Sequence, residues 1–238
     1  APMSLAMPET RIGFFPDVGG GHFLSRCPGY AGEWLALTGN AVSGADALAI
    51  GWADHWLPST RLPEFWQQLA EKQWSDSAAI AQWVTQSCDP APAVSDDFDH
   101  GLRQAEHYFA GTDLAAIVRQ LEQAKGDAWA QATAATLRQR SPLMLHVVLR
   151  QIRSGRALSY AQNIYRERVM VHHCFHPDHL GRAPRHSEVI EGIRALVIDK
   201  DQRPLWQPER VEDVTPEMAE GFFAEVWRPG DHPLRQLL

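Results

Sequence analysis

The sequence has little cysteine, no excess of basic residues and no long hydrophobic run, and each absence excludes a class of protein. Three widely spaced cysteines in 238 residues favour free thiols in a reducing compartment over a disulfide framework. The formal net charge of −7 offers no basic face for nucleic acid. No apolar stretch approaches the roughly 18 residues of a membrane helix. We therefore expect no nucleic-acid or membrane partner, and a cytoplasmic location, or the mitochondrial matrix in a eukaryote.

Several catalytic and ligand-binding motifs are also absent. The glycines at 19–21 match neither the G-x-G-x-x-G pattern nor a Walker loop, so no nucleotide site is indicated. No G-x-S-x-G nucleophile elbow occurs, and Ser141 and Ser159 stand where helix N-caps are expected. These patterns exclude a serine hydrolase and a dinucleotide-binding enzyme as first hypotheses.

A histidine-rich segment at residues 172–179 is the one candidate for a metal site. His172 and His176 are four residues apart and would share a helix face. Pro177, however, ends the helix there, and no carboxylate lies between the two histidines as in H-E-x-x-H. We predict a polar helix end and no metal site, because imidazoles are favourable near the negative end of the helix dipole.

The hydrophobic content of 45% indicates a globular chain, and its pattern is mainly helical. Apolar residues in 114–121 recur at i, i+3, i+4 and i+7, which is typical of one buried helical face. Ser141 and Pro142 form a strong helix start. Short strands are expected near the start, over 52–57, and over 196–198. The fold class is therefore α/β, with this chain mostly α-helical.

The pattern divides the chain into three segments. Residues 1–60 are expected to complete an α/β core, residues 61–140 to form a helical insertion, and residues 141–238 to form a helical C-terminal region with a proline-rich tail. The candidate catalytic groups lie in the first segment.

Two carboxylates, Glu9 and Asp17, stand among proline, glycine and aromatic residues, which is unusual for a solvated surface. Phe14 and Phe15 lower the local dielectric constant, which raises a carboxyl pKa and suits the group to acid, base or nucleophile chemistry. The glycines at 19–21 permit close backbone approach and leave their amides free to face a ligand. Alternatively, the two carboxylates are a loop group and a helix cap, and the residue types alone favour neither.

The pattern P-E-T-x-I-G-x-F-P-D-V-G-G-G over residues 8–21 resembles the active-site segment of the crotonase (enoyl-CoA hydratase/isomerase) superfamily. Hydratases carry glycine where this chain has Asp17, whereas the 3-hydroxyisobutyryl-CoA hydrolase group carries Glu and Asp together, as Glu9 and Asp17 stand here. Residues 35–54 and 191–206 resemble the L-T-G…G-x-A-D and E-G-x-R-A…P-x-W segments of the family. The resemblance thus extends over most of the chain.

This resemblance implies the C-terminal portion of a crotonase-like ββα spiral fold. In the family, a sizeable N-terminal part precedes the motif and supplies much of the CoA pocket and both amides of the oxyanion hole. That missing N-terminal part of the same enzyme is therefore an expected partner of this chain. A homo-oligomer is also compatible with the resemblance.

The activity implied is hydrolysis of the thioester of 3-hydroxyisobutyryl-CoA or a similar short 3-hydroxyacyl-CoA. Coenzyme A belongs to the substrate, and no other cofactor is expected. Glu9 would be the nucleophile that forms an acyl-enzyme anhydride, or the base that activates water. Asp17 would orient the substrate hydroxyl or the water, or take part in proton transfer.

The resemblance also implies substrate contacts. Gly13, Gly19 and Gly20 are expected to approach the acyl-CoA, and Lys200 occupies a position that lies near bound CoA in many members, sometimes across a subunit boundary. Its ammonium would act as a point charge on phosphate, and the alternative is a solvated helix end. Two other functions remain open: an enoyl-CoA hydratase or isomerase, which Asp17 disfavours, and a non-catalytic helical interaction fragment.

Overall fold

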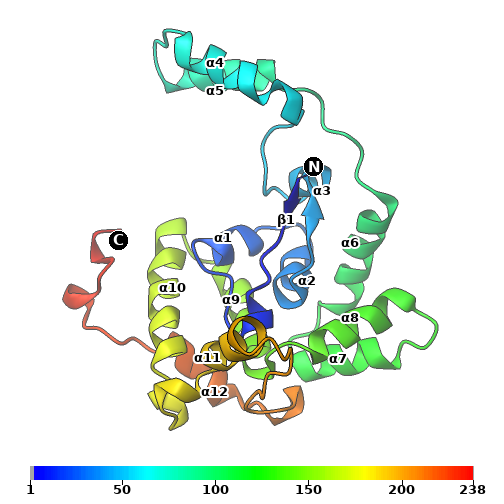
Figure 1. Ribbon diagram of the computed structural model, residues 1–238, viewed down its shortest axis with the longest axis vertical. Helices are drawn as coiled ribbons and strands as arrows, with labels where there is room; N and C mark the ends of the chain where they lie inside the picture. Colours follow the sequence, from blue (N-terminus) through cyan, green and yellow to red (C-terminus); the bar gives the residue numbers. More distant parts are fainter. Residues whose placement is uncertain (1–2, 238) are drawn as a thin grey trace. The chain divides into compact units, whose positions relative to one another are not determined.

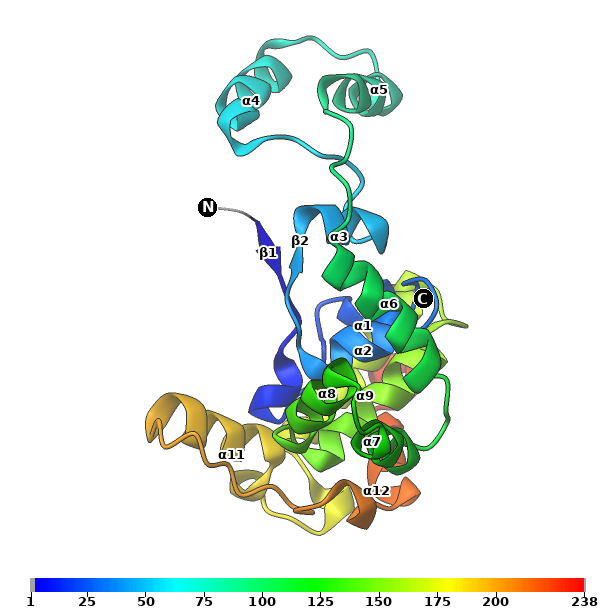
Figure 2. The same cartoon turned by 90° about the vertical axis from the view of Figure 1, so that its right-hand side faces the viewer.

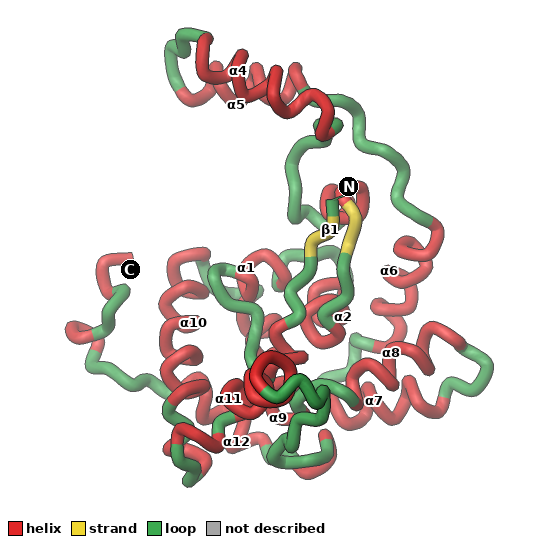
Figure 3. Tube along the Cα trace, in the orientation of Figure 1, coloured by secondary structure: helices red, strands yellow, loops and turns green. Residues whose placement is uncertain are grey.

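The computed structural model describes residues 3–237, and most of them are helical (Figures 1 and 3). The α-helices are α1 (Gly20–Leu24), α2 (Ala31–Thr38), α3 (Gly44–Ala49), α4 (Leu62–Glu71), α5 (Ser77–Ser87), α6 (Asp96–Tyr108), α7 (Leu114–Gln123), α8 (Ala128–Arg138), α9 (Pro142–Gly155), α10 (Tyr160–Phe175), α11 (Glu188–Ile193) and α12 (Pro216–Glu220). Shorter 3-10 helices are η1 (Glu9–Ile12), η2 (Ser59–Arg61), η3 (Asp178–Leu180), η4 (Pro184–His186), η6 (Val211–Asp213), η7 (Gly221–Phe223), η8 (Pro229–Asp231) and η9 (Arg235–Leu237), and η5 (Arg194–Ile198) is a π-helix. None of the described helices is both long and apolar enough to cross a membrane.

The strands are shorter than the sequence predicts. Near the start, β1 (Ser4–Leu5) pairs antiparallel with β2 (Val42–Ser43), which confirms the first predicted strand. The strand predicted over 52–57 is wrong, because only Trp56 forms a bridge, to Asp89. The strand predicted over 196–198 is also wrong, because these residues continue α11 as the π-helix η5. Within residues 3–237 neither segment lies in the β1–β2 sheet. Tertiary context therefore overrides the β-propensity of their apolar residues.

The chain forms two compact units, and the three segments predicted from the sequence stay a prediction. The first unit comprises the residues up to Leu5 and Val42–Asp99. Within it, α4 and α5 are neighbouring helices (Figure 2), held together by the aromatic rings of Phe65, Trp74 and Trp83. No residue of α4 or α5 is fully buried, so this hairpin is a thin layer without a core.

The second unit, Ala6–Ala41 with His100–Leu238, contains the core and both candidate carboxylates. Helix α9 lies at its centre and packs against α1, α2, α7 and α12 (Figure 1). The apolar face of α9 is buried, and so is the face of α7 predicted over 114–121. This packing turns one polar side chain of α9, Gln151, into the interior, where it is completely buried.

The helix starts predicted from the sequence are confirmed. The Ser141 hydroxyl caps α9 by accepting a hydrogen bond from the Met144 amide, with Pro142 as the first helical residue. A capping box between Ser159 and Gln162 opens α10. Each cap satisfies amides that the first turn of a helix leaves unpaired. The caps fix the starts of α9 and α10, the two helices that contact the loop carrying Asp17.

Candidate active site

Glu9 opens the 3-10 helix η1, which is fixed by two neighbouring elements of the second unit. The next residue, Thr10, is completely buried, and its hydroxyl donates to the Leu37 carbonyl of α2 at 3.1 Å. The Thr10 carbonyl accepts from the Ser141 amide at the start of α9, at 3.3 Å. The backbone beneath Glu9 therefore has little freedom, and its side chain extends from a rigid turn.

The Glu9 carboxyl is half-buried, and its Oε2 atom is buried without a hydrogen-bond partner among residues 3–237. The pKa of Glu9 is raised to about 7, mainly by burial and to a smaller extent by the negative charge of Asp17, whereas a hydrogen bond from its own backbone amide lowers it. The group thus changes protonation near neutral pH, where a general base or nucleophile works best. An unpaired buried carboxyl oxygen is also rare in proteins and needs an explanation, such as a substrate or water contact.

Asp17 is half-buried as well, and burial raises its pKa above the ordinary value, although a hydrogen bond from its own amide opposes this. The expectation that Asp17 caps the following helix is wrong. Gly19 is the N-cap residue of α1, and no side chain caps this helix. Within the described chain Asp17 thus has no capping role, its charge acts on the Glu9 carboxyl, and its catalytic role stays a prediction.

The loop that carries Asp17 has an unusual backbone. Val18 has φ of 48° and its side chain is 80% exposed. A β-branched residue rarely adopts positive φ, and a residue in such a region costs on the order of 1–3 kcal/mol. Gly19 follows with φ of 90°, and the Gly20 amide donates to the Asp17 carbonyl at 2.7 Å. Strain of this kind persists only where surrounding contacts impose it.

Those contacts come from α9 and α10. The Glu167 carboxylate accepts hydrogen bonds from the amides of Gly19 and Gly21, at 2.8 and 3.1 Å. The Gln151 side-chain amide donates to the Pro16 carbonyl at 2.8 Å. The expectation that the glycine amides are free to face a ligand is therefore wrong. Neither residue stood out in the sequence, because each is one of several polar residues on its helix.

Gly13 lies where the segment that carries Glu9 packs against the helix that carries the E-G-x-R-A motif. It ends η1 with φ of 70°, and a Cβ there would lie 2.3 Å from the Glu188 carbonyl oxygen. A Cβ on Gly192 would lie 2.2 Å from the Ile12 carbonyl oxygen. The backbones of η1 and α11 are thus in direct contact, which only glycine permits. The substrate-binding roles expected for Gly13, Gly19 and Gly20 stay predictions.

Lys200 lies in an exposed turn after η5, with φ of 57°. Before the turn, Arg194 forms ion pairs with the carboxylates of Glu191, Asp199 and Asp201. The turn is linked to η1 by a hydrogen bond of 3.2 Å from the Arg11 guanidinium to the Gln202 side chain. The ion pairs compensate the charge of Arg194, whereas the Lys200 ammonium is exposed to solvent. Its contact with CoA stays a prediction.

The histidine-rich segment packs against the C-terminal part of the chain. His172 stacks on His176 at 4.5 Å and contacts the Trp227 ring edge-on at 5.3 Å. The His173 ring nitrogen lies 2.8 Å from the Ala224 carbonyl oxygen. Within residues 3–237, no group of three His, Cys, Asp or Glu side chains converges as metal ligands do. These rings fill the space between α10 and the following chain.

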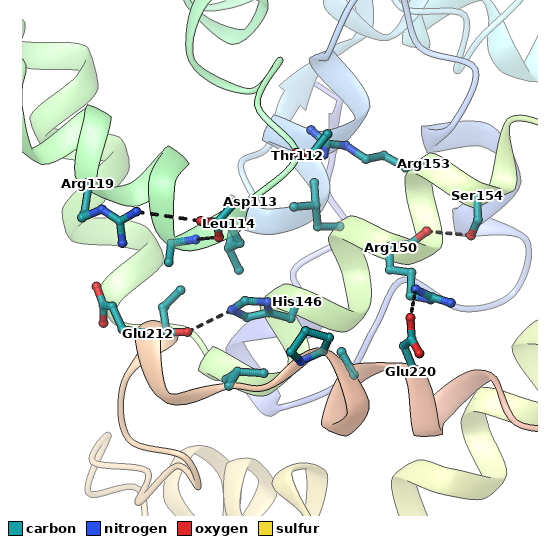
Figure 4. Close-up of a pocket in the computed structure, with 16 residues that line it drawn as sticks. Thr112, Asp113, Leu114, Arg119, His146, Arg150, Arg153, Ser154, Glu212 and Glu220 are labelled. Carbon is teal, nitrogen blue, oxygen red and sulfur yellow. Dashed lines mark hydrogen bonds and ion pairs between the residues drawn. The ribbon is translucent and has the colours of Figure 1, made fainter.

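A separate groove of about 870 Å³ lies between α7, α9, η6 and α12 (Figure 4). Its charged walls are paired with each other, as Arg150 with Glu220 at 2.8 Å and Arg119 with Asp113 at 3.8 Å. The His146 ring contacts the Val211 carbonyl at 3.0 Å. The residues that line it include neither candidate carboxylate, so this groove is not the site described above.

Residues 2–223 match the enoyl-CoA hydratase/isomerase family. The chain belongs to this family. The solved structure of a carnitinyl-CoA dehydratase from Mycobacterium thermoresistibile is similar, with a TM-score of 0.76, 32% identity, and 94% of this chain and 60% of that chain covered. This likeness confirms the predicted crotonase-like fold, with its mostly helical C-terminal portion.

Two curated relatives in the family differ in name. The chain is 36% identical over 230 residues to 3-hydroxyisobutyryl-CoA hydrolase 1 of Arabidopsis thaliana, covering 95% of this chain and 59% of the relative. It is 34% identical to small ribosomal subunit protein mS47 of the same organism, covering 92% of this chain and 53% of the relative. The chain thus spans little more than half the length of these relatives.

Proposed function

We propose that the full-length protein hydrolyses the thioester of 3-hydroxyisobutyryl-CoA or of a similar short 3-hydroxyacyl-CoA. The observation that carries the proposal is the pair of half-buried carboxyls, Glu9 and Asp17, each with a raised pKa and close enough to interact electrostatically. The similarity to a relative named 3-hydroxyisobutyryl-CoA hydrolase supports the same chemistry. Addition of water to a double bond, in contrast, does not require a carboxyl at position 17.

Two routes of hydrolysis use these groups. In the first, the Glu9 carboxylate attacks the thioester carbonyl carbon, the carbon–sulfur bond breaks, and CoA leaves as the thiol after taking up a proton. Water then cleaves the mixed anhydride, which yields the hydroxy acid and restores Glu9. In the second, Glu9 takes the proton of a water molecule that attacks the carbonyl directly. In both, Asp17 orients the water or the substrate hydroxyl.

The reaction needs groups beyond this chain. Either route places negative charge on the carbonyl oxygen, which two backbone amides stabilise in an oxyanion hole. We infer that these amides come from the family's N-terminal part and that Lys200 contacts a CoA phosphate. Hydrolysis consumes only the thioester and water, so the proposal includes no further cofactor. The three free cysteines agree with a reducing compartment, the cytoplasm or the mitochondrial matrix.

A non-catalytic role is the alternative of another class. It is favoured by the similarity to a relative named as a ribosomal protein, which extends over 92% of this chain. A hydratase is the alternative within the family, favoured by the likeness to a solved dehydratase. The three functions differ in the product that the full-length protein releases.

The test is to incubate the full-length protein with 3-hydroxyisobutyryl-CoA and with crotonyl-CoA, and to follow both thiol release and loss of the double bond. The proposal predicts thiol release from the hydroxyacyl thioester, lost on Glu9→Gln and kept on Glu209→Gln, a matched change at an exposed position. Hydration of crotonyl-CoA without thiol release would support the hydratase. No reaction with either thioester would support the non-catalytic role.

A further inference from the structure

The backbone of the Asp17 loop is held by side chains that come from far along the chain. Glu167, on α10, is only 4% exposed and accepts hydrogen bonds from the amides of Gly19 and Gly21. These amides lie on the C-terminal side of Asp17, two and four residues on. One buried carboxylate thus holds both ends of the segment 19–21, where the loop leads into α1.

The loop also packs closely against other side chains, since a Cβ on Gly19 would lie 3.1 Å from Tyr160 and a Cβ on Gly20 would lie 2.6 Å from Met7. Val18 has a positive φ, and its side chain, 80% exposed, packs on little. Inside the loop, the Gly20 amide donates to the Asp17 carbonyl, and helix α1 begins at Gly20. Before Asp17, the anchor is the bond from Gln151 to the Pro16 carbonyl. Of these contacts, the two hydrogen bonds to Glu167 are the ones that hold the backbone amides directly after Val18.

The geometry requires both oxygens of Glu167 to be acceptors. Each oxygen faces an N–H group, so an NH₂ group in place of either oxygen would put two donors against each other. Burial raises the pKa of Glu167 above its ordinary value and the charge of Asp17 adds to this, whereas the hydrogen bonds from Gly19 and Gly21 and the charge of Arg166 oppose it. A charge buried in this way is compensated mainly by the two amides.

We propose that Glu167 is a positioning residue for Asp17, whose carboxylate fixes the strained loop and thereby aims the Asp17 carboxyl at the substrate. The proposal rests on the proposed function, since it assigns Asp17 a part in thioester hydrolysis. Glu167 itself does not touch the reacting atoms in this account. Its removal displaces Asp17 together with Gly19 and Gly20 of the same loop, and leaves Glu9, Gly13 and Lys200 in place.

A merely structural role for Glu167 would give a different result, and Glu33 supplies the control. Glu33, on α2, is also a completely buried carboxylate, and it pairs with Arg156 at 2.8 Å and with Arg153 at 3.5 Å. Neither of these two ion pairs involves a residue of the Asp17 loop. Glu33→Gln therefore removes a buried charge of the same kind without releasing the loop.

The experiment compares wild type, Glu167→Gln and Glu33→Gln as full-length proteins, at a temperature where circular dichroism shows all three folded. Thiol release from 3-hydroxyisobutyryl-CoA gives kcat and KM, and hydrogen–deuterium exchange of the peptide 16–22 reports on the loop. We expect Glu167→Gln to lower kcat by about 10- to 100-fold, with a smaller change in KM because Gly19 and Gly20 move with the loop. Exchange in 16–22 should accelerate in this variant alone.

Unchanged kcat and unchanged exchange in Glu167→Gln would overturn the proposal while leaving the hydrolase function standing. An equal loss of kcat in Glu33→Gln would overturn it too, because the effect would then follow stability. If the wild-type protein releases no thiol, the proposed function fails, and the exchange of 16–22 alone decides whether Glu167 holds the loop. If Glu167→Gln does not fold, Glu167→Asp, which keeps the charge but is one methylene shorter, replaces it with the same expected outcomes.

Discussion

The side-chain amide of Gln151 donates a hydrogen bond of 2.8 Å to the backbone carbonyl of Pro16, the residue before Asp17. The two residues are 135 positions apart, and Gln151 is completely buried in the centre of α9. The candidate site is therefore not a property of the Glu9–Gly21 motif alone. Its geometry is set by helices that follow much later in the chain.

Gly21 lies where these contacts meet, and a side chain there should break them. A Cβ on Gly21 would lie 2.6 Å from Nε2 of Gln151 and 3.0 Å from Oε1 of Glu167. We expect Gly21→Ala to lower the free energy of unfolding by about 1–3 kcal/mol through overpacking, and to lower thiol release. Urea unfolding measures the first effect.

Gly230→Ala is the matched control, because a Cβ on Gly230 would meet nothing within 4 Å. Its free energy of unfolding should stay within about 0.5 kcal/mol of wild type. If Gly21→Ala is as stable and as active as Gly230→Ala, then the close contacts of Gly21 do not constrain the loop.

Helix starts and buried faces could be predicted because they depend on local chemistry. Ser141 before Pro142, and Ser159 before Gln162, satisfy amides of the same helix turn, so spacing alone indicates them. The apolar face of α7 recurs with the helical period and is buried as expected. The motif also indicated Glu9 and Asp17, which are half-buried and interact electrostatically, whereas their catalytic roles stay predictions.

The missed features depend on contacts distant in sequence. Glu167 and Gln151 are buried only because α9 and α10 pack against the Asp17 loop, and nothing near them in the sequence indicates it. The apolar residues 196–198 resemble a strand, but Arg194 forms an ion pair with Glu191 of α11, and the backbone continues as a π-helix. Local helix and strand propensities predict poorly where such tertiary contacts determine the backbone conformation.

Glu9→Gln removes the group that acts as nucleophile or base. In the full-length protein we expect kcat for thiol release to fall by about 10²- to 10⁴-fold, with acyl-CoA binding largely kept. Glu209→Gln, at an exposed position, should behave like wild type. Initial rates and a binding titration with a CoA thioester measure the two quantities. Wild-type turnover in Glu9→Gln would make Glu9 a structural residue.

The pH dependence of activity should report the Glu9 carboxyl. Its pKa is raised to about 7, first by burial and also by the charge of Asp17. Since the ionised form attacks the thioester or activates water, kcat/KM should rise with pH and level off above about 7. A profile already flat from pH 5 to pH 8 would contradict the raised pKa or the role of Glu9.

The same shift predicts how stability depends on pH. Because folding raises the pKa of Glu9 from 4.5 to about 7, the folded state binds this proton more tightly than the unfolded state. The resulting stabilisation is fully present below pH 4.5 and is lost as pH rises to about 7. Glu9→Gln should therefore gain stability relative to wild type between pH 4 and pH 8. A difference that does not change with pH would argue against a desolvated carboxyl.

Glu33 should be important for stability and not for chemistry. It is completely buried and paired with Arg156 and Arg153, so Glu33→Gln leaves both guanidinium groups without their carboxylate. Because both arginines are partly exposed and can be hydrated, we expect a loss of about 3 kcal/mol in unfolding free energy, the low end for a broken buried pair. Urea unfolding against Glu209→Gln checks this, and a loss below about 0.5 kcal/mol would contradict it.

The measurement that tests the central claim most directly is the rate of thiol release from 3-hydroxyisobutyryl-CoA by full-length Asp17→Asn. Asp17 caps no helix and its charge is partly desolvated, so the variant should melt no lower than wild type. Its rate should nevertheless fall by about 100-fold, because the second carboxyl no longer orients the water or the substrate hydroxyl. A folded Asp17→Asn protein that releases thiol at the wild-type rate would contradict a two-carboxylate thioesterase.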